Sequence, residues 1–547
     1  MEDFKDQLIK ALTEALEAQK KSNELLHAQI DALQSKLEKE EATVANLNET
    51  IEYLKRKIFG RSSEKTPDVD PNQMTIWDFF DEAEKEANPQ EQEPTEGQLI
   101  SYFKQKKGKQ SRKDMLKGVP VKEVTCTLEG RVCPDCGTPL EVIGRKYDRQ
   151  ELQIIPAQLK LIKYYHEVYK CPGCSTDEDD VIIEPDVTKA LIPHSLASTS
   201  TVAYIMYRKY AMYEPLYRLE KEYAQMGAKI SRGVMANWVI HTSLNYLKPV
   251  FELLHQELLK RDIAHADEVP CQVLKEPGRK AQSKSYMWIY TTGNDGLPGM
   301  VLYDYRPGRS GNYAREFLKG FKGYLHCDGY QGYNSLEDVV RIGCLAHARR
   351  YFFEAIPKRA AADAKTAAQT GVAYYDKLFL IERAIKDLPP DEIKRQREEK
   401  EAPILEEFFE WIKTLHPANG SRLAKAVNYS INQKQSLYGY LKDGRLEASN
   451  NAAERRCKSY VMGRKNFLFH DQVDGAEASA IIYSLVETAK INGLNIYSYL
   501  YQLLMNMPGL IKSSKGIENM LPWSDYMQKC CPKIEETKKE IRPVGMK

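Results

Sequence analysis

The segment DIAHADEVPCQVL (residues 262–274) decides the fold, because it sets the acidic residue Asp267 in an apolar run rich in β-formers. A second such run, GYLHCDGYQGY (residues 323–333), carries Asp328 where its apolar part ends. We expect both runs to be strands near the middle of one sheet. Neighbouring strands would then bring the two carboxylates within reach of a shared metal ion.

A third acidic residue, Glu454, lies in SNNAAERRCKSY (residues 449–460), which we expect to form a helix. Hard divalent cations prefer oxygen ligands, and a pair of them can clamp the attacking and leaving oxygens of a phosphodiester. Asp267, Asp328 and Glu454 are therefore the predicted catalytic residues. Glu268 follows Asp267 directly and would point to the opposite face of a regular strand, so we leave it outside the metal site.

The pattern around these acids predicts an RNase H-like domain. Three consecutive strands come first, then a helix, two further strands and another helix, and a mostly helical insertion precedes the helix of Glu454. The three first strands are expected at residues 263–274, 285–292 and 299–305, and the helix after them at 310–321. The two further strands are expected at 322–328 and 340–344, the next helix at 345–356 and the insertion at 360–444.

Length and composition limit the remaining possibilities. A chain of 547 residues suggests roughly three or four domains. The net charge is only +2, so any affinity for nucleic acid must come from local basic segments. Neither an apolar run of about eighteen residues nor a signal peptide is recognised. Eleven cysteines, four of them in CxxC pairs, fit a reducing cytosol and metal binding better than disulfides.

The N-terminus carries a seven-residue apolar repeat that predicts a parallel two-stranded coiled coil. A long amphipathic helix packed on its own chain is the alternative. Asn23 and Glu40 interrupt the repeat and would weaken the seam while fixing its register. The two apolar positions are occupied by Ile30, Leu37, Val44, Ile51 and Ile58, and by Leu26, Leu33, Leu47 and Leu54.

Two CxxC pairs, Cys133 with Cys136 and Cys171 with Cys174, predict a structural zinc ribbon. The residues between them are rich in β-formers, and a hairpin there would bring four thiolates around one ion. Four protein ligands leave no open position, so this zinc would not be catalytic. Four ordinary buried thiols are the alternative.

Residues 214–227 and 231–247 are expected to form two helices joined by a short turn at Gly227, the plan of a helix-turn-helix. Ser231 is the expected N-cap of the second helix, and Arg232 a contact to phosphate or bases. A plain helical packing region is the alternative. The residues expected to face inward are Val234, Trp238 and, as a further candidate, His241.

Other polar residues near the three acids are candidate DNA contacts. Cys344 and His347 form a CxxH pattern, which either places substrate or is a satisfied core pair. Basic side chains near the site would neutralise the DNA backbone. They are Arg349, Arg350, Arg455, Lys458, Arg464 and Lys465.

The sequence resembles the transposases of the insertion-sequence-66 family, a DDE group of bacterial mobile elements. Two small departures are Val269, where Thr is frequent, and Ser449, where Asp often precedes the Asn pair. The matching segments include KRKIFGRSSEK, CPDCG, ELQIIPAQLKLIKY, IPHSLASTSTVAYI, HADEVPCQVL, KSYMWIY, YLHCDGYQGYN, GCLAHARRYF, NNAAERRCK and GRKNFLF.

The resemblance implies a DNA transposase that binds terminal inverted repeats and uses Asp267, Asp328 and Glu454 as its triad. It also implies two catalytic Mg²⁺ ions, with Mn²⁺ as a substitute, and one structural Zn²⁺. Its partners would be double-stranded DNA, a second copy of the chain and small accessory proteins. Its location would be the cytoplasm, in association with the bacterial nucleoid. A nuclease or resolvase that cuts without joining, and a non-catalytic zinc-containing regulator, are the rival functions.

The expected fold class is multidomain α/β, with a coiled coil, a zinc ribbon, a helical DNA-binding region and the RNase H-like domain in that order. The helical insertion divides the last of these, and an acidic and then basic linker follows the coiled coil. The domain ranges are 1–60, 61–118, 119–190, 191–260, 261–359, 360–444, 445–507 and a tail at 508–547.

Overall fold

The structure is a computed structural model, and it describes part of the chain. The described residues are 19–20, 23, 29–30, 33–34, 157–171, 182–185, 189–357, 366–513 and 515–532. Most of the predicted coiled coil, the linker of residues 61–118, and Cys133, Cys136 and Cys174 lie outside them. Within the N-terminal repeat, Ile30 and Leu33 are helical and exposed.

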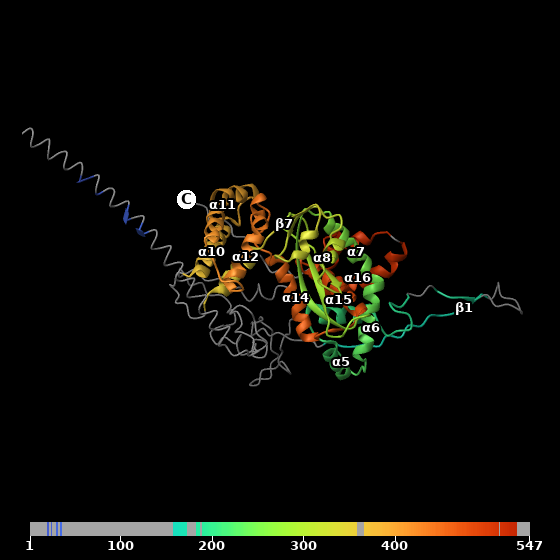
Figure 1. Ribbon diagram of the computed structural model, residues 1–547. Coiled ribbons are helices and arrows are strands. Elements are labelled where there is room, and N and C mark those ends of the chain that lie inside the picture. The colour runs from blue at the N-terminus through green and yellow to red at the C-terminus, as the bar shows by residue number, and fades with distance from the viewer. Residues whose placement is uncertain are drawn as a thin grey trace, which may run out of the picture.

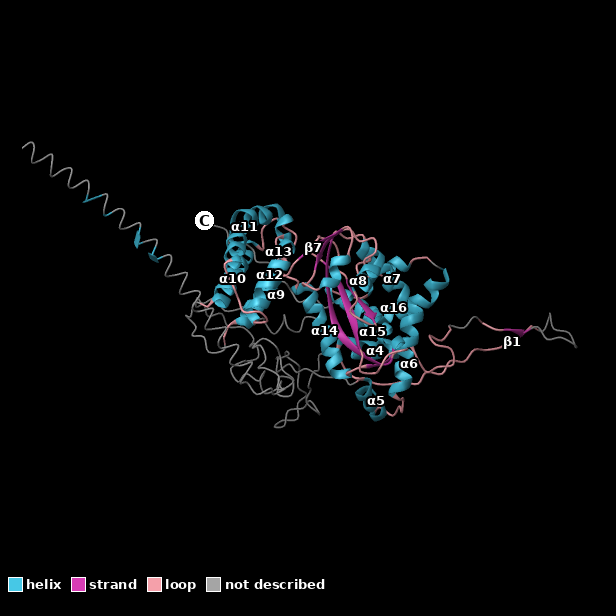
Figure 2. Ribbon diagram, in the orientation of Figure 1, coloured by secondary structure: helices cyan, strands magenta, loops and turns pink. Residues whose placement is uncertain are grey.

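A mixed sheet forms the centre of the molecule (Figure 2). Its strand order is β5-β4-β3-β6-β7, antiparallel from β5 to β3 and parallel from β3 to β7, and the short β8 pairs with the far end of β3. The long central strand β3 and the next two strands match the three expected from the sequence. The bounds are β3 Ile263–Lys275, β4 Lys284–Thr292, β5 Val301–Arg306, β6 Gly323–His326, β7 Val339–Ile342 and β8 His470–Gln472.

Helices that precede and follow the strands in the chain pack against the sheet. The buried helix α15 (Val473–Ile491) runs along the edge strand β5, where the hydroxyl groups of Ser484 and Thr488 accept hydrogen bonds from the main-chain N–H groups of Tyr303 and Val301, at 2.8 and 3.0 Å. An edge strand presents main-chain groups that no neighbouring strand pairs, and these two bonds give partners to two such N–H groups of β5. Two shorter helices are α8 (Gly311–Phe317), which connects β5 to β6, and α9 (Leu345–Ala355), which follows β7.

The helices that precede the sheet share its hydrophobic core. Side chains such as Leu219, Trp238 and Leu254 belong to the same buried cluster as Trp288 and Tyr303 of the sheet. The helices are α4 (Thr199–Met206), α5 (Leu216–Gln225), α6 (Arg232–Thr242) and α7 (Lys248–Leu259), with π-helical turns at Tyr207–Ala211 and Ser243–Leu247.

The two helices expected around Gly227 are present as α5 and α6, and Ser231 caps α6 by accepting a hydrogen bond from the N–H of Val234. Gly227 has a φ of +91°, a conformation that suits glycine at the end of a helix. The prediction of the inward face is confirmed for Trp238, which is buried, and wrong for Val234 and His241, which are exposed. The buried stripe is Met235, Trp238, Val239 and Thr242.

The insertion forms a helical lobe at one side of the sheet (Figure 1). It packs on α9 and has its own hydrophobic core, which includes Phe352, Tyr375 and Phe408. Inside this lobe the guanidinium group of Arg397 pairs with Glu382 and donates to the carbonyl oxygen of Leu446 at 2.9 Å. The helices are α10 (Ala367–Ile385), α11 (Pro390–Lys413), α12 (Arg422–Asn432) and α13 (Lys434–Leu437), followed by a 3-10 turn at Gly439–Lys442.

The expected tail from residue 508 is folded where the structure describes it. Helix α16 (Ile496–Ser513) runs through Pro508, and a 3-10 turn (Ile517–Met520) and α17 (Asp525–Cys530) pack beside it. Met520 and Met527 are buried there. Among the described helices, none combines the length and the apolar character that crossing a bilayer requires.

A small hairpin lies apart from this core. Strand β1 (Tyr169–Lys170) pairs antiparallel with β2 (Ile182–Ile183), and Cys171 directly follows β1. Of the four predicted zinc ligands, Cys171 is the one that the structure describes.

Candidate active site

The first two predicted acids lie on β3 and just past the end of its parallel neighbour β6. His265 of β3 is in register with His326 of β6, and the two rings stack with their centroids 4.1 Å apart. Asp267 follows two residues later within β3, and Asp328 lies two residues beyond the last residue of β6. Burial raises the pKa of Asp267, and the negative charge of Asp328 raises it further. The two carboxylates are therefore close enough to interact electrostatically.

Main-chain groups fix how both carboxylates lie. The N–H of Glu268 donates to Oδ1 of Asp267 at 2.8 Å, and the N–H of Tyr330 donates to Oδ1 of Asp328 at 2.9 Å. The thiol of Cys457, on helix α14, donates to Oδ2 of Asp267 at 3.2 Å. The orientation of each acid is thus set by its surroundings.

Helix α14 (Asn451–Phe467) carries the third acid and packs against β3. It lies on the side of the sheet that faces the helical lobe (Figure 1). Glu454 is in the first turn, one helical turn before Cys457, so the two residues share a face of the helix. Because Cys457 contacts Asp267, this face is the one directed at the aspartates.

The carboxylate of Glu454 is nevertheless turned toward α9. Its Oε1 lies 3.4 Å from Nδ1 of His347, and its Oε2 lies 3.6 Å from a guanidinium nitrogen of Arg350. Burial lowers the pKa of His347, but the Cys344 thiol and the Glu454 carboxylate outweigh burial and raise it to about 9. Glu454 thus has ionic partners on α9, while Asp267 and Asp328 are held by other groups.

Asn450 anchors the start of α14, a role that the sequence did not reveal. Its Nδ2 donates to the carbonyl oxygen of Ala266 at 2.9 Å, and its Oδ1 accepts from Nδ1 of His265 at 3.0 Å. Its main-chain N–H donates to Sγ of Cys344 at 3.2 Å. Asn450 therefore ties α14 to β3 beside Asp267 and to the start of α9. The position of an Asn before a helix was the available signal, but its side chain bonds the strand instead of capping the helix.

Glu268 has a different environment from its neighbour. Its side chain is buried, accepts a hydrogen bond from the hydroxyl of Tyr333 at 2.6 Å, and pairs with Arg309. Burial raises the pKa of Glu268 to about 7, with a contribution from the charge of Asp328. Arg309 also lies 3.9 Å from Asp328, so it links Glu268 to the candidate site.

The candidate DNA-contacting residues differ in their exposure and in their partners. Arg455, Lys458 and Lys465 are exposed along one face of α14, at helical spacing. Arg464 donates to the carbonyl oxygen of Pro270, and Arg349 pairs with Asp376 of α10 at 2.7 Å. His347 and Arg350 face Glu454, as described above, and Arg232 is exposed at the start of α6.

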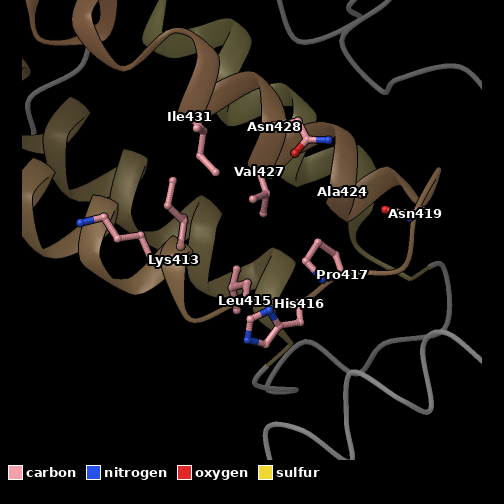
Figure 3. Close-up of a pocket in the computed structure, with 10 residues that line it drawn as sticks. Lys413, Leu415, His416, Pro417, Asn419, Ala424, Val427, Asn428 and Ile431 are labelled. Carbon is pink, nitrogen blue, oxygen red and sulfur yellow. The ribbon is translucent and has the colours of Figure 1, made fainter.

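A surface hollow of about 360 Å³ lies elsewhere, between the end of α11 and α12 in the helical lobe (Figure 3). Leu415, Val427 and Ile431 line it, together with polar side chains such as His416 and Asn428. None of the three predicted acids lines it, so the candidate site is defined by its chemistry and not by this hollow.

Sequence comparison decides the family. The profile described as "Transposase IS66 family" matches residues 194–478, which is more than half of the chain. The chain belongs to the IS66 family of transposases. Family membership implies an enzyme of DNA transposition.

Three further profiles of the IS66 transposases match other parts of the chain. The zinc-finger binding domain of transposase IS66 matches residues 131–175, which include all four predicted zinc ligands. The profile "Transposase C of IS166 homeodomain" matches residues 46–124, and the IS66 C-terminal element matches residues 484–523.

Proteins of Sinorhizobium fredii are similar in sequence to this chain. The uncharacterized protein y4jD is 27% identical over 496 residues, covering 88% of this chain and 94% of that protein. The uncharacterized protein y4qI is 27% identical over 538 residues, covering 94% of this chain and 96% of its own length. The likeness extends over nearly the whole of each chain.

Proposed function

We propose that this protein is a DNA transposase that binds the terminal inverted repeats of a bacterial insertion sequence and catalyses strand cleavage and strand transfer. Asp267, Asp328 and Glu454 are its proposed catalytic triad. The observation that carries the proposal is that Asp267 lies on β3 and Asp328 just past the end of the neighbouring parallel strand β6, with interacting charges, beside the helix of Glu454.

The proposed site fits hard divalent cations. Asp267 and Asp328 offer carboxylate oxygens. Burial, and then the charge of Asp328, raise the pKa of Asp267, and a cation between the two carboxylates would relieve their repulsion. Oε1 of Glu454 is buried without a hydrogen-bond partner among the described residues. Two Mg²⁺ ions, or Mn²⁺ in their place, would activate the attacking oxygen and stabilise the leaving 3′-oxygen.

The protein's own groups prepare the site for this chemistry. The N–H groups of Glu268 and Tyr330 hold one oxygen of each aspartate, so the carboxylates need little reorganisation when a cation binds. Glu454 would complete the set by turning from His347 and Arg350 toward Asp267. His347 and Arg350 would then be available to a scissile phosphate.

DNA binding is proposed for the exposed basic face of α14, formed by Arg455, Lys458 and Lys465. Its position next to the triad supports this, because contacts to phosphates fix the register of a duplex on a protein. Arg349 and Arg464, which have protein partners, and Arg232 at the start of α6 are further proposed contacts. Helices α5 and α6 would act as a helix-turn-helix whose second helix enters the major groove.

The remaining parts of the proposed enzyme follow the order expected from the sequence. A zipper in residues 1–60 would hold two copies together, and Cys133, Cys136, Cys171 and Cys174 would bind one structural Zn²⁺. The catalytic part would be RNase H-like, with a three-stranded meander followed by two parallel strands and an inserted helical lobe. Small accessory proteins are proposed as further partners.

End processing on a DNA fragment with the element's own repeats tests the proposal. In Mg²⁺, the natural protein should nick at the repeat tips and join the ends to a target, and Asp328→Asn should do neither. Asp338→Asn is the matched control, since Asp338 is exposed and lies ten residues further along. Cleavage without joining would favour a nuclease, and tight binding without cleavage would favour a regulator.

A further inference from the structure

Cys344, His347 and Glu454 form a compact set of three metal-ligating side chains. Among the described residues, their donor atoms all lie within 4.8 Å of one another. Cys344 is the N-cap of α9, and His347 is in the first turn of the same helix. Glu454 comes from the first turn of α14, so the set joins the starts of two helices, and His347 and Glu454 are 107 residues apart in sequence.

Two atoms in this set are buried without a hydrogen-bond partner. They are Nδ1 of His347 and Oε1 of Glu454, which face each other at 3.4 Å. Buried polar atoms in a folded protein are nearly always satisfied, by protein groups, by water or by an ion. An ion bound between these two atoms and the thiol would satisfy both.

The mixture of donors distinguishes this set from the two aspartates. A thiolate and an imidazole favour Zn²⁺ and similar softer cations, whereas Mg²⁺ favours oxygen ligands alone. The main-chain N–H of Asn450 donates to Sγ of Cys344, a contact that would stabilise the thiolate. Arg350 holds the second oxygen of Glu454, which leaves Oε1 directed at His347.

We propose that Cys344, His347 and Glu454 form a binding site for a softer divalent cation, of which Zn²⁺ is the type, and that this site shares Glu454 with the catalytic triad. Binding releases the proton of the Cys344 thiol and the proton on Nδ1 of His347 to solvent, and the Sγ, Nδ1 and Oε1 atoms become the three protein ligands. Three protein ligands leave one coordination position open.

The consequence rests on the proposed function. A cation in this site keeps Glu454 on the α9 side, and Glu454 is then withdrawn from Asp267 and Asp328. Zn²⁺ therefore inhibits Mg²⁺-dependent cleavage, and the enzyme responds to which metal is present.

Binding is tested with Co²⁺, whose bond to a thiolate gives a charge-transfer absorption band in the near ultraviolet. The full-length protein is first loaded with a single equivalent of Zn²⁺, enough for its four-cysteine site alone, and then titrated with Co²⁺. The natural protein should bind one more Co²⁺ than Cys344→Ser or His347→Asn, with a thiolate band that both variants lack. Glu454→Gln should weaken this binding by about tenfold or more. Cys271→Ser, a change at another buried cysteine of the sheet, should bind as the natural protein does.

Using both Cys344→Ser and His347→Asn separates loss of a ligand from a folding defect, because His347→Asn leaves the buried Cys344 in place. An unchanged stoichiometry and band in both variants would overturn the proposal. The binding result does not depend on activity, so failure of the proposed function would be recognised separately as absence of cleavage in Mg²⁺ alone.

The inhibition is tested by adding Zn²⁺ to the cleavage reaction. Cleavage by the natural protein should fall when Zn²⁺ is far below the Mg²⁺ concentration, and cleavage by Cys344→Ser should not. Equal inhibition of both proteins, or none in a natural protein that binds Co²⁺ as described, would refute the shared role of Glu454.

Discussion

Replacing Asn450 by Ala should loosen the start of α14 and leave the rest of the fold in place. The Asn450 side chain is almost completely buried, at 1% exposure, and makes two hydrogen bonds to β3. The pairing of β6 with β3 ends at His326, so the carbonyl of Ala266 has Asn450 as its partner instead of a strand. Nδ1 of His265 also loses its acceptor in the variant.

The size of the effect follows from these two bonds. Leaving a buried donor or acceptor unsatisfied costs about 1–3 kcal/mol, so the loss of both hydrogen bonds should cost roughly 2–6 kcal/mol locally. Each 1.4 kcal/mol corresponds to a factor of ten in an equilibrium constant. The opening equilibrium of the first turns of α14 should therefore rise by about 30-fold or more.

Hydrogen–deuterium exchange of peptides that cover α14 measures this opening directly. Asn451→Ala is the matched control, because Asn451 is the next residue and is exposed. Exchange in α14 should accelerate in Asn450→Ala and remain unchanged in Asn451→Ala, with peptides from α11 unaffected in both. Equal exchange in the two variants would refute the assignment of Asn450 as the anchor.

Three other perturbations have defined outcomes. Burial, with Glu382 nearby, raises the pKa of Glu401, so the folded protein holds this proton more tightly than the unfolded chain and loses stability as pH rises from about 4.5 toward the raised pKa. Glu401→Gln should therefore gain stability relative to the natural protein between about pH 5 and about pH 8 in urea unfolding, and a constant difference would contradict this. Arg397→Met removes a buried guanidinium group and leaves the half-buried Glu382 without its partner, so it should destabilise the helical lobe by about 3–5 kcal/mol. An unfolding midpoint equal to that of the natural protein would exclude this role for the ion pair. Lys465→Ala should weaken binding to the repeats and reduce the salt slope by about 1, while Lys400→Ala, on α11, should leave both unchanged.

The sequence predicted the sheet well, because its signals are local. Alternating apolar residues and turn residues mark the strands around Asp267 and Asp328 within one or two residues of their observed ends. The apolar run before Asp328 also predicted its place at the end of a strand. The helix of Glu454 begins within one residue of the expected position.

The face of α6 was harder to predict, because tertiary packing decides it. This helix is packed by α4, α5 and α15, and the buried stripe follows Met235 and Val239. Val234 lies one position away from that stripe and is exposed, although its side chain is as apolar as that of Val239. Periodicity alone does not fix the rotation of a helix that several neighbours contact.

The contacts that organise the candidate site could not be predicted from local pattern. Asn450 reaches His265 across 185 residues, and Cys457 reaches Asp267 across 190. The pairing of Glu268 with Arg309 similarly depends on how the loop after β5 returns to β3. These residues carry no distinctive spacing, so their roles emerged only from the folded arrangement.

The most direct test of the central claim exchanges a proposed oxygen ligand for sulfur. Asp328→Cys should lose cleavage at the repeat tips in Mg²⁺ and regain a measurable part of it in Mn²⁺, because a thiolate accepts the softer cation better. The natural protein should cleave with either metal, and unchanged thermal unfolding would establish that the variant is folded. Full cleavage by Asp328→Cys in Mg²⁺ would contradict the assignment of Asp328 as a metal ligand.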